Sequence, residues 1–303
     1  MAPGSERLTA GIAWTGIVLL ALLIVVGGVV TASASGLGCG AQWPTCQGQL
    51  LPPGGIHPTL EWSHRVLAAV TGMVIAAYAG VVFVRRRSRL LVGLAVASLL
   101  LLALQAFLGE QTVLLGLPSW VVATHDAVAL LLLESLLAGA IVAGRGDRRL
   151  PAGVLVWAPA AISVGVVFMG SDLAHLDVAC TGLSGCVGAL VGGSDVVGLP
   201  AVAHWALAAA LFVTGIWAID RMPQDQPARF WLVVGLALLT LQAALGVLLL
   251  VTGLSPAILA VHEPIGLFTG AAFFVAAAEA SLAGKGHSFE PLPAGMKAER
   301  PRT

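Results

Sequence analysis

The sequence predicts an all-α membrane protein with eight transmembrane helices, arranged as two parallel-repeat four-helix bundles with both termini cytoplasmic. Composition, eight long apolar runs and an internal repeat predict this fold. The chain is 58% hydrophobic and only 10% charged, whereas soluble domains carry about 25% charged residues. A water-soluble core cannot bury this much apolar surface, so lipid must be the main solvent. The formal net charge is zero, which gives no basic surface for nucleic acid.

Each predicted helix is an apolar run long enough to cross a bilayer, which takes about 20 residues. The eight runs span residues 9–31, 61–84, 90–112, 121–143, 152–170, 201–219, 230–252 and 258–281. Ala32-Ser33-Ala34 after the first run resembles a signal-peptidase site. The run is longer than the usual apolar core of a signal peptide, about 7–15 residues. We therefore expect an uncleaved first helix.

The distribution of basic residues predicts the orientation. With the N-terminus inside, 14 of the 15 Lys and Arg residues fall in inner segments, and only Arg65 lies near the outer side. Cytoplasmic loops of membrane proteins are enriched in Lys and Arg. We therefore expect a multi-pass protein of the cell membrane with a cytoplasmic tail at 285–303. The Pro- and charge-rich composition of this tail is typical of disorder.

The chain contains two copies of one four-helix unit. Residues 104–126 (LQAFLGEQTVLLGLPSWVVATHD) align without gaps with 241–263 (LQAALGVLLLVTGLSPAILAVHE), and nine of 23 positions are identical. The segment HRVLAA at 64–69 likewise matches HWALAA at 204–209. Because four is even, both copies have the same orientation, as in parallel repeats. We expect one bundle at 1–143, a cytoplasmic linker at 144–152 and a second bundle at 153–284.

Four histidines occupy matched places in this repeat: His64, His125, His204 and His262. Each lies three to four residues inside the outer end of a predicted helix, about 5–6 Å deep at 1.5 Å per residue. A bundle core can hold a planar cofactor between facing helices, and two histidines on separate helices can ligate haem iron from opposite faces. Zinc is the alternative, but it prefers four ligands, and two histidines per bundle would need others. The pattern favours haem sites toward the outer face.

All four cysteines fall in predicted outer loops, in CGAQWPTC and CTGLSGC. The outer face is oxidising, which favours local disulfides between Cys39 and Cys46 and between Cys180 and Cys186. The first pair encloses a Trp-Pro dipeptide and lies close to Glu61, so a functional role competes with simple stapling of the loop. A zinc site made by all four cysteines is the less favoured alternative, because the pairs belong to separate bundles.

Glu61 breaks the repeat. It lies three residues before His64 and so shares its helix face, whereas the matching residue of the second copy is Ala201. This asymmetry suggests that the bundle with Glu61 performs chemistry and that the other holds a haem for electron transfer. A partly buried carboxyl group can serve as a proton-transfer group, or it can simply favour a helix N-terminus. Arg65 can pair with a haem propionate or extend toward the interface.

The combination of GLGCGAQWPTCQG, EWSHRV and the four repeated histidines resembles the haem A synthase family over about residues 9–281. The resemblance implies oxidation of a methyl group of haem O to a formyl group, which gives haem A for terminal oxidases. It implies that His64 and His125 serve the substrate haem, that His204 and His262 hold a haem b, and that Glu61 is the catalytic acid or base. An electron acceptor and a haem O synthase are the expected partners.

Two other functions are compatible with the pattern. A dihaem membrane electron carrier of the quinol-linked cytochrome b type would use both bundles equivalently and contain only haem b. A thiol-oxidising membrane protein would depend on the outer cysteines. The absence of a Cys-x-x-Cys motif counts against the thiol-oxidising function.

Overall fold

The computed structural model describes residues 3–85, 87–145, 154–176, 182–191 and 195–282, and the regular structure within these ranges is helical. The chain forms nine helices there: α1 (Pro3–Ala32), α2 (Ile56–Val84), α3 (Arg89–Leu114), α4 (Ser119–Arg145), α5 (Val154–Ala174), α6 (Gly182–Val191), α7 (Asp195–Arg221), α8 (Pro227–Val251) and α9 (Pro256–Leu282). No β-strand occurs in the described part; Cys46 and Gln49 form one isolated β-bridge.

Eight of these helices are long and apolar enough to cross a membrane, which confirms the predicted number of spans. Six of them cover a predicted apolar run completely, whereas α5 begins two residues after the start of its predicted run and α8 ends one residue before the end of its own. The remaining helix is α6, a ten-residue helix between α5 and α7, which was not predicted. It is apolar but far too short to cross a bilayer, so hydropathy in a spanning-length window does not detect it.

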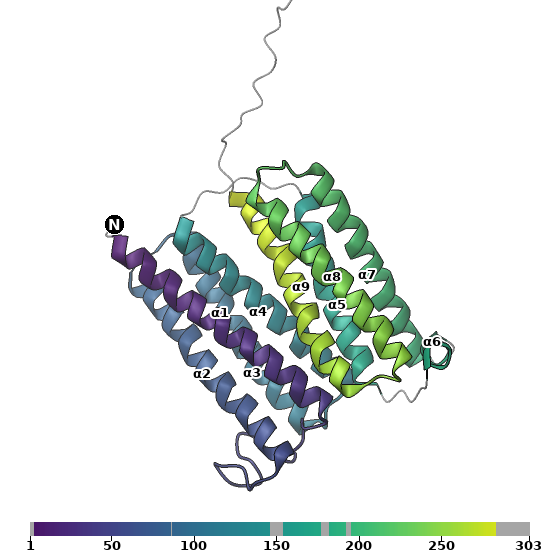
Figure 1. The fold of residues 1–303 in the computed structure, drawn as a ribbon. Helices are drawn as coiled ribbons and strands as arrows, with labels where there is room; N and C mark the ends of the chain where they lie inside the picture. The colour runs from purple at the N-terminus through teal and green to yellow at the C-terminus, as the bar shows by residue number, and fades with distance from the viewer. Residues whose placement is uncertain (1–2, 86, 146–153, 177–181, 192–194, 283–303) are drawn as a thin grey trace, which may run out of the picture.

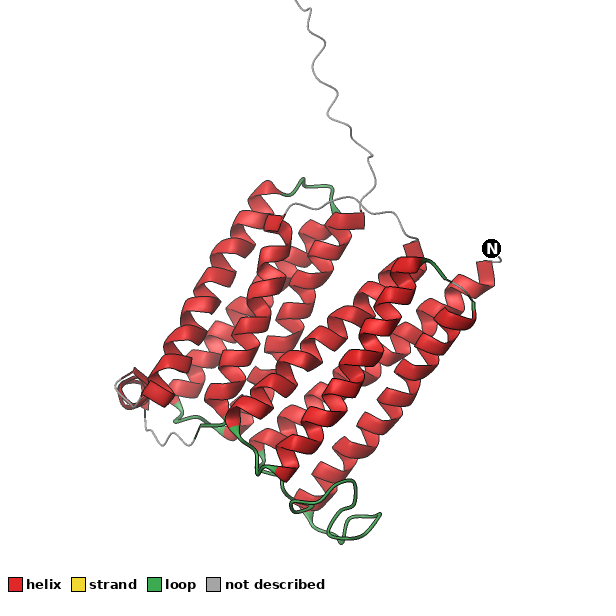
Figure 2. Ribbon diagram, turned by 180° about the vertical axis from the view of Figure 1, so that it is seen from behind, coloured by secondary structure: helices red, strands yellow, loops and turns green. Residues whose placement is uncertain are grey.

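The spanning helices lie side by side in two groups (Figures 1 and 2). Helices α1–α4 form the N-terminal half, and α5 with α7–α9 forms the C-terminal half. Contacts between the halves run through α1 and α4 on one side and α5 and α9 on the other. The first residues of α1 and the last residues of α9 lie at the same end of the array (Figure 1). The cytoplasmic side and the domain boundaries at 144–152 stay predictions, and the tail at 285–303 lies outside the described residues.

Helix α4 is the centre of the molecule. In its most apolar window 78% of residues are buried, against 39% for α9, the next highest. It contacts α1, α3, α5 and α9, so protein rather than lipid covers most of its surface. Leu130, Leu132 and Leu136 on this helix are fully buried in the larger apolar core. A side chain on α4 is therefore held more rigidly than one on a lipid-facing helix.

The sequence repeat extends to backbone geometry. Between α3 and α4, Gly116 and Leu117 have φ values of 74° and 60°, and between α8 and α9, Gly253 and Leu254 have 69° and 63°. In each turn the leucine N–H donates to a carbonyl five residues earlier, at 2.7 Å. Glycine tolerates this left-handed conformation and leucine does so only with strain. The same turn thus sets α4 against α3 and α9 against α8.

Candidate functional site

The four repeated histidines lie within four different helices: His64 in α2, His125 in α4, His204 in α7 and His262 in α9. Each helix begins earlier in the chain than predicted, so the rings lie deeper than the expected 5–6 Å. Counted from the start of each helix at 1.5 Å per residue, they are about 9–14 Å inside. They therefore lie well within the helix array, where polar side chains need a partner or a ligand.

The structure brings the histidines together in the expected pairs. His64 is close enough to His125 to interact with it electrostatically, and His204 is in the same relation to His262. One ring of each pair comes from the second and one from the fourth spanning helix of its half. Ligation of haem iron by these pairs stays a prediction.

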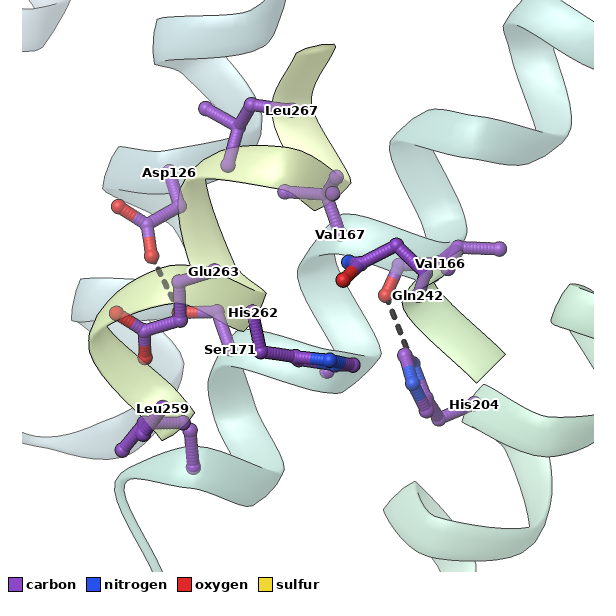
Figure 3. A pocket seen from close by; sticks show the side chains of 13 residues that line it. Asp126, Val166, Val167, Ser171, His204, Gln242, Leu259, His262, Glu263 and Leu267 are labelled. Atoms are coloured by element: carbon purple, nitrogen blue, oxygen red, sulfur yellow. Dashed lines mark hydrogen bonds between the residues drawn. The ribbon is translucent and has the colours of Figure 1, made fainter. Parts of the chain in front are cut away.

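The C-terminal pair opens into a large cavity. Its volume is about 770 Å³, and it lies among α5, α7, α8 and α9 with contributions from α6. Figure 3, which draws a smaller pocket that shares both histidines, shows the rings of His204 and His262 projecting toward the same space. The remaining lining is mostly apolar, with small residues such as Ala208, Ala243 and Gly246. Pockets of about 300–1,000 Å³ with apolar walls and few polar groups are typical of cofactor sites.

His204 is oriented for ligation by a hydrogen bond on its other nitrogen. Its Nδ1 donates to the carbonyl oxygen of Val166 on α5, at 3.0 Å (Figure 3). A carbonyl can only accept, so the proton is on Nδ1 and the lone pair on Nε2 is available to a metal. Histidine ligands of metals usually have such a bond. Together with the cavity, this arrangement fits a bis-histidine haem.

A glycine from a neighbouring helix lies against each of the four rings. A Cβ added at Gly170 would lie 2.7 Å from Cε1 of His204, and one at Gly27 would lie 3.3 Å from Nε2 of His64. At Gly109 and Gly246 the corresponding distances to Cε1 of His125 and His262 are 3.2 and 3.6 Å. Gly109 and Gly246 are among the identical positions of the aligned segments 104–126 and 241–263, whereas Gly27 and Gly170 were not predicted to belong to the site. Their similar placement in the first helix of each half was the available signal.

In the N-terminal half, His125 has a side-chain partner. The amide nitrogen Nε2 of Gln105 on α3 donates to Nε2 of His125 at 2.9 Å. Oε1 of Gln105 and Nδ1 of His125 are buried without a partner. The repeat-related atoms, Oε1 of Gln242 and Nδ1 of His262, are also buried without a partner. Both halves therefore leave polar atoms around the histidine of their fourth spanning helix for a ligand to satisfy.

Glu61 is buried, with 4% of its surface exposed, and both carboxylate oxygens have partners. Oε2 accepts from the backbone N–H of Cys39 at 2.7 Å, and Oε1 accepts from the guanidinium of Arg65. The matching residue of the C-terminal half, Ala201, is also fully buried but has no polar side chain. The asymmetry seen in the sequence is therefore an asymmetry of buried polar contacts.

Arg65 connects the loop between α1 and α2 to α2 itself. Its Nη1 donates to the carbonyls of Pro44 at 3.3 Å and Thr45 at 2.9 Å, and its guanidinium lies 5.0 Å over the ring of Trp43. With the bond to Glu61, these contacts form a clamp between α2 and the loop. They occupy much of the guanidinium, and its buried Nε has no partner. The propionate role of Arg65 stays a prediction.

The clamped loop is closed by a disulfide between Cys39 and Cys46, as predicted. Both cysteines are fully buried, and the ring they close contains the three loop residues that Arg65 contacts, Trp43, Pro44 and Thr45. Trp62 adds a further attachment by donating from Nε1 to the carbonyl of Leu50 at 2.8 Å. The predicted second disulfide involves Cys180, which lies outside the described residues.

Asp126 and Glu263, the acids that follow His125 and His262, meet at the boundary between the halves. They interact electrostatically with each other, and Asp126 accepts a hydrogen bond of 2.6 Å from the Ser171 hydroxyl (Figure 3). Both line a cavity of about 50 Å³ that also touches His204 and His262. Their meeting was not predicted, because it depends on how the two halves pack.

No group of three or more His, Cys, Asp or Glu side chains in the described ranges is arranged to hold a metal ion. The zinc alternative therefore finds no ligand set among these residues. Two histidines per site instead suit the iron of a haem, because the porphyrin supplies the remaining ligands. The fold and these sites define the class: a multi-pass helical membrane protein with one buried pair of histidines in each half.

Comparison with known proteins identifies the family. A family model described as a cytochrome oxidase assembly protein matches residues 55–137, which cover α2, α3 and most of α4. Heme A synthase of Symbiobacterium thermophilum is 32% identical over 256 residues, covering 77% of this chain and 82% of that protein. Heme A synthase of Bacillus cereus is 26% identical over 272 residues, with 83% and 88% covered. The chain belongs to the heme A synthase family, as its motifs had indicated.

Proposed function

We propose that this chain oxidises a methyl group of haem O to a formyl group and so supplies haem A to terminal cytochrome oxidases. Membership of the heme A synthase family supports the product. The observation that supports this chemistry is the buried carboxylate of Glu61, three residues before His64, where the matching residue of the other half is the buried Ala201. A carrier with two equivalent haems would have no use for this difference.

The C-terminal half is the site proposed for a resident haem b. His204 and His262 would hold its iron, and the apolar cavity of about 770 Å³ would enclose the macrocycle. When bound, haem b supplies one-electron redox chemistry. The protein contributes the orientation of His204 through Val166 and the exclusion of water by the apolar lining.

The N-terminal half is the site proposed for haem O, between His64 and His125. Conversion of a methyl to a formyl group passes through the alcohol in two two-electron oxidations. With water as the source of the oxygen atom, each oxidation releases two protons, and its two electrons pass to the separate electron acceptor. Glu61 is the group proposed to accept the protons. A carboxylate has about four lone-pair positions, and the bonds from Cys39 and Arg65 use two of these. Capacity for a proton or a bridging water therefore remains on both oxygens.

The proposed setting is the cell membrane, with the histidine pairs nearer the outer face. The eight apolar helices and the lipophilic substrate support it. A haem O synthase would deliver the substrate, and a separate acceptor would remove electrons from the C-terminal haem. We expect lipid to surround the rest of the helix array.

The test is extraction of haems from membranes of a host that makes haem O and expresses this chain. Chromatography and mass measurement identify the products. Appearance of haem A, or of its alcohol precursor, supports the proposal. Haem b alone, from folded protein with haem O present, would overturn it in favour of the dihaem electron carrier.

A further inference from the structure

The hydrogen bond between Gln105 and His125 has a chemical consequence for a haem ligand. An amide nitrogen only donates, so Nε2 of His125 must accept, and its ring proton must be on Nδ1. An imidazole nitrogen has a single lone pair in the ring plane. The bond of 2.9 Å therefore uses the same lone pair that iron would need.

The two halves differ at this point. Gln242 matches Gln105 in the repeat, yet no hydrogen bond joins Gln242 to His262 in the described part of the chain. The amide nitrogen of Gln242 lies against α9 at Gly266, where an added Cβ would approach it to 2.8 Å. Gly266 is one helical turn beyond His262. The ring of His262 thus opens into the large cavity, while Nε2 of His125 is already engaged.

We propose that Gln105 is a positioning residue that competes with haem iron for Nε2 of His125 and so keeps the substrate haem exchangeable. This inference rests on the proposed function, in which haem O enters and haem A leaves the N-terminal half at every turnover. A substrate site needs release, whereas a site for a resident haem needs retention. The two halves differ in this respect: Gln105 lies on the ligand nitrogen of His125 and favours release, whereas Gln242 lies away from His262 and permits retention.

Transfer of haem O from the full chain to excess apomyoglobin measures exchange directly. The protein is loaded with haem b and haem O in detergent micelles, and the rate of haem O loss is followed by absorbance. Gln105→Leu removes the competing donor at similar side-chain volume. We expect transfer from this variant to be about fivefold slower than from the wild type, the effect of one net hydrogen bond. Carbon monoxide binding to the reduced N-terminal haem should weaken by a similar factor.

Gln242→Leu is the matched control in the other half, and it should change haem O transfer less than twofold. If Gln105→Leu does not retain haem b, and therefore does not fold, Gln105→Met repeats the test with a flexible side chain. Transfer from the folded variant at or above the wild-type rate would overturn the proposal for Gln105. The proposed function fails separately, if the wild-type chain makes no haem A.

Discussion

The two halves share a framework but differ around it. Both place a histidine on their second and fourth spanning helices, a glycine against each ring and the same left-handed turn before the fourth helix. The N-terminal half has Glu61, which is held by the backbone of the loop between α1 and α2. The C-terminal half has Ala201 instead and a large apolar cavity beside its histidines.

This difference shows how one unit can serve two purposes. The positions proposed to hold a flat ligand are kept in both halves, because the proposal requires the same approach of imidazole and backbone in each. The positions proposed to act on the ligand differ, and they lie in the loop between α1 and α2 and in the first turns of α2. Substitutions that alter one half and leave the other half intact test this interpretation.

The largest effect is expected from Glu61→Gln. The amide keeps the shape and can accept from Cys39, but it cannot take up a proton. Loss of a positioned acid or base typically lowers turnover about 10²- to 10⁴-fold. The ratio of haem A to haem O in extracts measures turnover, and the haem b absorption of the C-terminal half should be unchanged.

Ala201→Glu is the reciprocal change. It places a carboxyl group at the matching position of the C-terminal half without the loop or Arg65. We expect it to restore no activity to Glu61→Gln. Wild-type yields of haem A from Glu61→Gln alone would remove Glu61 from the mechanism.

The next largest effect is expected from Gly170→Ala. The added methyl would lie 2.7 Å from Cε1 and 2.9 Å from Nδ1 of His204, so the ring must turn and its bond to Val166 must break. Loss of such a supporting bond usually lowers metal-site affinity about 10- to 100-fold. Titration of the purified protein with haem b measures the affinity. Gly246→Ala, whose methyl would lie 3.6 Å from His262, is the control and should weaken binding far less; equal losses would contradict the argument.

Sequence alone was sufficient for the spanning helices, because each is a long and predominantly apolar run and lipid imposes its length. The sequence did not predict α6, which is apolar but short, and it placed the starts of several helices too late in the chain. Residues 56–60 (IHPTL) begin α2 five positions before the expected start. Polar residues and proline made this turn look like a loop. The early start is why His64 lies deeper than predicted.

The site was predictable where the repeat marked it and not where packing created it. His64, His125, His204 and His262 were found because both copies carry them. The two hydrogen bonds to Glu61, from Cys39 and Arg65, depend on the loop folding back onto α2. No local sequence pattern predicts this fold. The meeting of Asp126 and Glu263 likewise depends on how the halves dock. Pairs that form between distant segments leave no periodic signal in a single sequence.

Arg65→Lys separates the two roles considered for this residue. Lysine keeps the charge but cannot span Glu61 and two loop carbonyls with one planar fork. If the clamp matters, turnover falls about tenfold, the value of one lost hydrogen bond to a charged group, and haem O still binds. A propionate role predicts weaker haem O binding instead. Equilibrium binding of haem O, measured beside the yield of haem A, distinguishes the two.

The smallest effect is expected from Trp43→Leu, which tests the edge of the clamp. The ring lies 5.0 Å from the guanidinium of Arg65 and is 37% exposed, so solvent weakens their cation–π contact to about 0.5–1 kcal/mol. Removing it should lower the yield of haem A about two- to fivefold. Trp120 lies at the start of α4 and is 60% exposed. Trp120→Leu removes a comparable ring outside the clamp and should leave the yield unchanged. If both variants lose activity equally, the effect belongs to the membrane interface and not to the grip of the first loop on Glu61.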